Sequence, residues 1–254
     1  MKKILFILVI LAFCGSLVAQ KHQHHSHKKP PPLEEKETRK VLFGVYFGPT
    51  VDWIVPTSNE LTRKAAKAGF ITGLGVDINL TPKKILYFST GAFVRYLQGE
   101  FEFTNRYKFN FNNFLVLDTL NTVRTYQTTY LAIPTGIKVR TAIAKDCVFL
   151  GSLGLYHNFR IAGKQFDHFS LPGVDDEYMI TTKKVNNKDA SLFAESAYVG
   201  IGFEYLLGHN TRVSAHVNYG CQFNYFNSKA ENNVTHERFK SIAHSLQIVV
   251  GFLF

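Results

Sequence analysis

The amino-acid sequence predicts an all-β fold, an eight-stranded antiparallel up-and-down transmembrane β-barrel. From Val41 onward, apolar residues recur at every second position with small or polar residues between them, which is typical of strands with two different faces. The connections between the strands alternate between short and long, as in barrels with short periplasmic turns and longer extracellular loops. The expected strands are at about 41–51, 69–80, 85–103, 123–141, 147–161, 192–207, 211–226 and 239–254. The expected long loops are 52–68, 104–122, 162–191 and 227–238.

The residues of the non-apolar row favour a transmembrane barrel over a soluble, lipocalin-like barrel, which also has eight alternating strands. A soluble barrel hides its apolar row inside, and its outer row should be rich in Lys, Glu and Asp. Here the other row holds mostly small residues that suit a crowded interior, among them Gly73, Gly75, Ser89, Gly91, Ser152, Gly154, Gly200 and Gly202. We therefore expect the apolar row to face lipid. Aromatic residues near the strand ends are expected to form interfacial girdles: Tyr96, Phe101, Tyr130, Phe159, Phe203, Tyr205, Tyr225 and Phe254.

The first twenty residues have the three-part layout of a secretory signal peptide, with cleavage expected near Ala19-Gln20. The apolar run from Ile4 to Phe13 is too short to cross a bilayer as a helix, which takes roughly 20 apolar residues. Phe13 stands where a small residue would precede a lipidated cysteine, which disfavours a lipid anchor on Cys14. We expect an exported protein of the cell outer membrane in a Gram-negative cell. Its expected parts are a signal peptide at 1–20, a disordered His/Pro-rich tether at 21–40 and the barrel at 41–254.

The tether 21–40 holds almost nothing that could be buried, and it contains the run Pro30-Pro31-Pro32. Its four histidines are weak candidates for binding Zn²⁺ or Cu²⁺, although a solvated low-complexity stretch explains them equally well: His22, His24, His25 and His27. The three carboxylates of 175–177 lack the spaced ligands of a calcium loop. We expect no cofactor.

The formal charge of +10 is spread thinly along the chain rather than gathered into a stripe. Nucleic acid is therefore an unexpected partner for this exported protein. Outer-membrane lipid headgroups and lipopolysaccharide phosphates are the more plausible counter-charges. The long loops offer surface for envelope protein partners, because binding residues concentrate on loops held by a rigid scaffold.

Charged residues also fall on the expected inward row. An eight-stranded barrel has room for little beyond its own side chains, and unpaired buried charge is costly, so we expect a hydrogen-bonded plug of ion pairs. The expected polar cluster consists of Asp77, Lys138, Glu204 and Arg212 near the periplasmic end, with Arg95, Arg160 and His216 higher up. The alternative is a permeation path lined by the arginines, which would make the protein a minor porin for small solutes.

A lipid A-modifying enzyme is a further alternative. A hydrolase would need a hydroxyl near a histidine that a carboxylate orients, at the lipid-exposed upper rim. His244 faces outward there, but Ser245 points to the opposite face and no carboxylate is obviously beside the imidazole. His157 and His168 read as isolated histidines. We therefore expect no catalytic residue and no enzymatic activity.

The two cysteines of the barrel are expected to stay unpaired, even though an exported protein meets an oxidising compartment. The strand pattern places Cys147 at a short turn, whereas it places Cys221 in the upper part of another strand, facing lipid.

The segment from Tyr130 to Lys138, which reads YLAIPTGIK, resembles the Y-L-x-I-P segment of the PorT-like outer-membrane β-barrel family of Bacteroidetes. The run from Gly44 to Gly48 and the terminal Phe254 are also similar. The resemblance implies an outer-membrane barrel without a defined activity, and Phe254 resembles the signal read by the barrel-assembly machinery. We expect a structural or interaction role: envelope integrity, a complex subunit or loop-mediated binding. Pro134 removes a ladder donor, so we also expect it at a bulge or a weak point of pairing, with a local bend in its strand.

Overall fold

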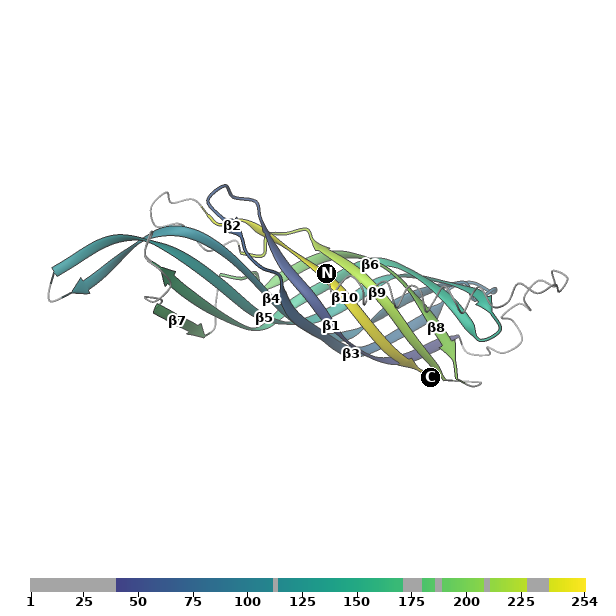
Figure 1. Ribbon diagram of the computed structural model, residues 1–254. Helices are drawn as coiled ribbons and strands as arrows, with labels where there is room; N and C mark the ends of the chain where they lie inside the picture. The colour runs from purple at the N-terminus through teal and green to yellow at the C-terminus, as the bar shows by residue number, and fades with distance from the viewer. Residues whose placement is uncertain (1–39, 112–113, 171–179, 186–188, 208–210, 228–237) are drawn as a thin grey trace, which may run out of the picture. The chain divides into compact units, whose positions relative to one another are not determined.

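The computed structural model describes residues 40–111, 114–170, 180–185, 189–207, 211–227 and 238–254 (Figure 1). These residues form strands and no helix, so none of them lies in a helix long and apolar enough to cross a bilayer. The strands are β1 (Val41–Pro56), β2 (Thr62–Arg63), β3 (Lys67–Asn79), β4 (Leu86–Phe111), β5 (Phe114–Ala144), β6 (Cys147–Ser170), β7 (Ile180–Val185), β8 (Phe193–Leu206), β9 (Arg212–Gln222) and β10 (Ser241–Leu253).

Eight of the strands close into an antiparallel barrel, in the order β1-β3-β4-β5-β6-β8-β9-β10. Pairing of β10 with β1 and of β4 with β5 completes the ring, so the sheet has no open edge within it (Figure 1). The short strands β2 and β7 lie outside the ring and pair with β4 and β6. The predicted fold class, an eight-stranded up-and-down barrel, is confirmed.

The strands β4 and β5 are much longer than predicted. Their pairing continues without interruption from Phe101↔Arg124 to Phe111↔Phe114, so the expectation of a long loop at 104–122 was wrong. This segment is rich in Asn and Thr, which hid its strand character in the sequence. A transmembrane strand needs only about 9–11 residues, so the two strands reach well beyond the membrane. Figure 1 shows this long hairpin at one end of the barrel.

The outer surface of the barrel is apolar. Large apolar side chains of the outward row are strongly exposed, whereas the small and polar row faces inward. Outward examples from five strands are Phe43, Leu74, Leu153, Val199, Ile201 and Phe252. This is the arrangement expected of lipid-facing strands, and it is the reverse of a soluble barrel. The predicted direction of the alternation is confirmed.

Two of the aromatic residues assigned to the interfacial girdles lie elsewhere. Phe101 and Tyr130 are buried inside the barrel rather than exposed to lipid. Each is separated by an even number of positions from an inward-facing residue, Arg95 and Lys138 respectively, so strand periodicity itself requires them to face inward. Proximity to a strand end was therefore a poorer guide than the alternation.

Prolines interrupt the barrel ladder at two places. The register of β4 with β5 skips Pro134, as predicted, and the register of β1 with β10 skips Pro49. The register of β5 with β6 shifts between Thr129 and Tyr130 and again between Ala142 and Ala144, so both irregularities lie away from Pro134. Each proline therefore weakens pairing on one side of its strand only, because Pro134 keeps its partner in β6 and Pro49 keeps its partner in β3.

Gly48 is required where β1 approaches β10. A Cβ atom added to Gly48 would collide with the carbonyl oxygen of Ile248, a backbone atom that cannot rotate away. We expect Gly48→Ala to lower the free energy of unfolding by about 1–3 kcal/mol, measured by urea titration in detergent micelles. Gly151→Ala is the matched control, because a Cβ there meets nothing within 4 Å. Equal unfolding midpoints for the two variants would contradict this assignment.

Candidate functional site

Five charged side chains meet inside one end of the barrel, the end with the short turns, which we expect to face the periplasm. The Lys138 ammonium donates to Asp77 at 2.8 Å, and Arg140 donates to the same carboxylate at 2.6 Å. Arg140 also donates to Glu204 at 2.9 Å. Glu204 accepts a second hydrogen bond from Arg212 at 3.4 Å. The two carboxylates and three cations therefore form one continuous network, which we call the lower plug.

The lower plug lies inside the barrel, and each of its five side chains is buried. It is built from β3, β5, β8 and β9, close to the ends where these strands meet short turns. The Arg140 guanidinium also lies over the Tyr87 ring at 4.1 Å. Because breaking such a pair leaves an uncompensated buried charge, each member holds the others in place.

Arg140 was missing from the cluster predicted from the sequence. It stands two positions after Lys138 on the same strand, so the alternation that placed Lys138 inside also places Arg140 inside. The signal was therefore present in the sequence. Arg140 bridges Asp77 and Glu204, which makes it the central cation of the lower plug.

Of the other predicted interior residues, Arg95 and Arg160 lie away from the lower plug, whereas His216 borders it across the Tyr46 ring, which Lys138 also contacts. Arg95 pairs with Asp52 at 3.2 Å, higher in the barrel, and Thr50 donates to the same carboxylate at 2.7 Å. Asp52 was missed because the first strand was expected to end at residue 51. His216 lies beside the Tyr46 ring, with 5.9 Å between ring centroids. Arg160 donates to the backbone carbonyl of Ala190. The sequence thus placed polar residues inside but did not resolve which of them meet.

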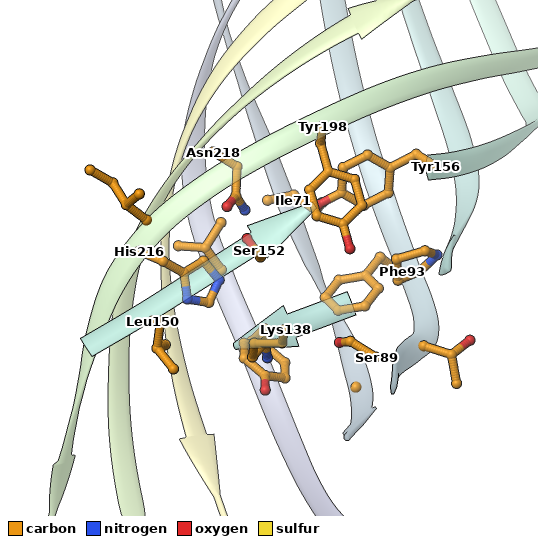
Figure 2. A pocket seen from close by; sticks show the side chains of 16 residues that line it. Ile71, Ser89, Phe93, Lys138, Leu150, Ser152, Tyr156, Tyr198, His216 and Asn218 are labelled. Atoms are coloured by element: carbon orange, nitrogen blue, oxygen red, sulfur yellow. The ribbon is translucent and has the colours of Figure 1, made fainter. Parts of the chain in front are cut away.

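A small cavity of about 50 Å³ lies above the lower plug. Figure 2 shows His216, Asn218 and Lys138 among its polar lining residues, opposite aromatic side chains. Tyr156 and Tyr198 close its far side, with 4.5 Å between their ring centroids. The volume suits a few ordered water molecules held by these polar groups.

An aromatic cluster fills the opposite end of the lumen, which we expect to face the cell exterior, and we call it the upper cap. Its rings pack closely: Phe103 and Phe239 are 4.6 Å apart, and Phe101 and Tyr126 are 5.6 Å apart, between centroids. Phe226 meets Tyr126 edge-on at 5.3 Å. All five side chains are buried. Burial raises the pKa of the Tyr126 phenol to about 12, so the ring stays neutral within the cap.

A buried ion pair supports the upper cap. The Arg124 guanidinium donates to both oxygens of Asp167, at 2.7 and 2.8 Å, in the bidentate geometry that gives strong charge-assisted hydrogen bonds. Gln165 donates to the same carboxylate at 2.9 Å, and Arg124 lies over the Phe103 ring at 5.0 Å. These contacts join β5 to β6 beyond the membrane. The extended strands therefore form a packed platform on top of the barrel.

Two of the described histidines and both described cysteines lie on the outer side of the strands or near a turn. His244 stacks on Trp53 at 5.7 Å, and its Nδ1 shares a 2.7 Å hydrogen bond with the Tyr219 hydroxyl. Both Cys147 and Cys221 are free thiols. His157 was expected to be isolated, but it contacts both the Thr135 hydroxyl and the Glu195 carboxylate.

Metal ligands do not gather in the part of the chain that the structure describes, where no group of three or more His, Cys, Asp or Glu side chains is placed to hold an ion. The candidate ligands His22, His24, His25 and His27 lie outside the described residues. The signal peptide and tether expected at 1–20 and 21–40 lie there too, apart from Lys40. The metal site of the tether therefore stays a prediction.

Comparison with known proteins gives a family and a set of distant structures. A family model described as an outer membrane protein beta-barrel domain matches residues 18–254. No curated protein matches the chain. Three solved structures are similar to it: Ail of Yersinia pestis (10% identity, TM-score 0.33, covering 85% of this chain and 100% of Ail), Neisserial surface protein A (11%, 0.36, 82% and 95%) and the outer membrane protease OmpT of Escherichia coli (10%, 0.32, 84% and 96%). The family match covers nearly the whole chain, so the protein belongs to the outer membrane protein β-barrel domain family and resides in the outer membrane.

Proposed function

We propose that this outer-membrane barrel has a structural or interaction role in the envelope and does not act as an open pore. The observation that carries the proposal is the filling of the lumen at two levels. The lower plug occupies the periplasmic end with five interlocked charges, and the upper cap occupies the extracellular end with five packed rings. A solute would have to separate buried ion pairs at one end and aromatic contacts at the other.

The extended hairpin of β4 and β5 supports an interaction role. Its strands pair up to Phe111↔Phe114, and β2 and β7 widen the sheet around its base. The bidentate Arg124–Asp167 pair stiffens the same region. A rigid surface that projects beyond the membrane suits docking of an envelope protein, because little ordering entropy is lost on binding.

We propose outer-membrane lipid and lipopolysaccharide as further partners, with the barrel-assembly machinery engaging Phe254. Exposed cations near the extracellular end support the contact with lipopolysaccharide phosphates. Arg63 lies over the Trp53 ring at 5.9 Å, and Lys240 lies over Tyr225 at 5.5 Å. An aromatic ring with a cationic side chain over its face is well suited to the headgroup level of a bilayer.

We also propose that the chain belongs to the PorT-like barrels of Bacteroidetes. The segment from Tyr130 to Lys138 supports it, because this segment lies in the membrane-spanning part of β5 and contains the ladder-breaking Pro134. Alignment with PorT-like sequences tests the proposal. A match of this segment at the same strand position would support it, and absence of the segment from that position would contradict it.

Conductance in planar lipid bilayers tests the closed lumen. Protein purified from outer membranes of an expressing host, and shown to be folded, should give no stable unitary current above that of the empty bilayer. Swelling of proteoliposomes in small sugars should match protein-free liposomes. A steady unitary conductance from the folded protein would overturn the closed-lumen proposal and favour the alternative of a minor porin for small solutes.

A further inference from the structure

Three polar side chains meet on the outer, lipid-facing surface of the barrel. Thr135 of β5, His157 of β6 and Glu195 of β8 belong to the outward rows of three neighbouring strands. The Thr135 hydroxyl lies 3.0 Å from His157 Nε2, and His157 Nδ1 lies 3.3 Å from Glu195 Oε1. We call these residues the outer triad.

The direction of each hydrogen bond follows from the tautomer of a neutral His157 beside a carboxylate. The ionised Glu195 carboxylate only accepts, so His157 Nδ1 carries the proton that it donates to Oε1. In the neutral imidazole, Nε2 is then an acceptor, and the Thr135 hydroxyl donates to it. This is the arrangement of a nucleophile, a general base and an orienting carboxylate in acyl-transfer enzymes.

The backbone positions all three groups. Each sits on a strand of the closed barrel, and His157 is directly opposite Glu195 in the ladder. The backbone N–H of Glu195 donates to the Asn224 side-chain oxygen at 3.1 Å, which ties the upper end of β8 to the residues that follow β9. A site on paired strands holds its geometry better than one on loops.

Counting residues along β6 leads us to place the outer triad at the depth of the ester groups of outer-leaflet lipids. His157 is ten residues above the start of β6 at Cys147 (157 − 147), which is about 25 Å for strands tilted by about 40°. Exposed Leu155 lies below it on the outward row, and the contacting pair Phe159 and Phe193 lies above it. The triad is thus flanked by apolar side chains toward the hydrocarbon and by aromatic side chains toward the headgroups.

Exposing polar side chains to lipid costs free energy, so three such side chains in contact with one another call for a functional explanation. The half-exposed carboxylate of Glu195 and the part-buried imidazole of His157 stay within reach of a lipid beside the barrel. Neighbouring outward residues form an apolar surface against which acyl chains can pack: Ile137, Leu153, Leu155 and Val199.

We propose that the outer triad hydrolyses an acyl ester of a membrane lipid in the outer leaflet, an activity beyond the structural role proposed above. Thr135 Oγ1 attacks the ester carbonyl carbon while His157 Nε2 takes the hydroxyl proton. The bond from the carbonyl carbon to the alcohol oxygen breaks, and the imidazolium returns its proton to that oxygen. Water, deprotonated by the same nitrogen, then attacks the acyl-threonine ester, the bond from the carbonyl carbon to Thr135 Oγ1 breaks, and the imidazolium returns the proton to Oγ1. One water is consumed, and a free fatty acid and the deacylated lipid are released.

The roles differ among the three residues. Thr135 and His157 touch the reacting atoms and are the catalytic residues. Glu195 acts through His157, so it is a positioning residue that selects the tautomer and stabilises the imidazolium. The sequence suggested a search for this chemistry around His244, but the hydroxyl and the carboxylate come from strands that are distant in the chain from His157.

The test uses the whole folded protein in mixed micelles containing phosphatidylethanolamine and lipid A, in water enriched with ¹⁸O. Mass spectrometry should detect free fatty acid with one ¹⁸O atom, and the lipid that loses the chain identifies which of the two is the substrate. We expect Thr135→Val and His157→Gln to lower the rate by about 100-fold or more, and Thr135→Ser to retain activity. Glu195→Gln should lower kcat more than it changes KM and should alter the pH profile of the rate.

Two controls separate catalysis from folding and from contamination. His244→Gln changes another outward histidine at a similar depth and should leave the rate unchanged, and every variant should keep the heat-modifiable gel mobility of a folded barrel. Absence of fatty-acid release by the folded wild type would overturn the proposal. Release that persists in Thr135→Val would overturn it too. Neither result bears on the closed lumen, which conductance tests independently.

Discussion

Replacing Glu204 with glutamine should lower the free energy of unfolding by about 3–5 kcal/mol. Glu204 accepts hydrogen bonds from Arg140 and Arg212, and its side chain is fully buried. Glutamine has nearly the same shape, so the change creates no cavity and removes only the negative charge. Three buried cations would then face the single carboxylate of Asp77. Urea titration of the protein in detergent micelles, followed by tryptophan fluorescence and gel mobility, measures the loss.

A second substitution makes the test specific. Adding Arg140→Met to Glu204→Gln removes one of the unbalanced cations, so we expect the double variant to be more stable than the sum of the two single losses predicts. Glu102→Gln is the control, because its ion pair with Lys64 is partly exposed and should contribute less than about 1 kcal/mol. Additive losses in the double variant would contradict a single interlocked plug.

Replacing Phe101 with alanine should cost about 3–5 kcal/mol and should loosen the extracellular end of the barrel. The Phe101 side chain is fully buried and contacts Phe103, Tyr126 and Phe239 in the upper cap. Its removal leaves a cavity in the centre of the cluster. Hydrogen exchange of the β4 and β5 amides near Phe103 should rise, alongside a lower unfolding midpoint in urea.

Phe223→Ala is the matched control for the upper cap. Phe223 lies just after β9 at the same end of the barrel, but 59% of its surface is exposed. We expect its truncation to leave amide exchange in β4 and β5 unchanged. If Phe101→Ala behaved like this control, the aromatic cluster would not be what closes the extracellular end.

The barrel itself could be predicted from the sequence because its main signal is local. Alternation assigns each side chain to one of two faces, and the composition of the rows shows which face meets lipid. This reasoning placed Asp77, Lys138, Glu204 and Arg212 inside and near one end, where the structure brings them together. The same alternation also places Arg140 inside the barrel, and it excludes Phe101 from the lipid-facing girdle.

The features that could not be predicted depend on register between strands. The contact of Thr135 with His157 is diagonal across the β5–β6 ladder, and a one-residue change of register would move the groups apart. Pairing of the hairpin beyond residue 103 likewise depends on its partner strand, because its polar composition alone indicates a loop. Upper-cap residues such as Phe226 and Phe239 meet only once the barrel has closed.

Gel mobility of the folded protein tests the central claim most directly, that the chain is a closed barrel inserted in the outer membrane. Protein extracted from outer membranes should migrate faster on an SDS gel before boiling than after it, with a β-rich far-UV circular dichroism spectrum that disappears when the mobility changes. A β-rich protein that stays soluble without detergent and shows no mobility shift would contradict the account and favour a soluble, lipocalin-like barrel.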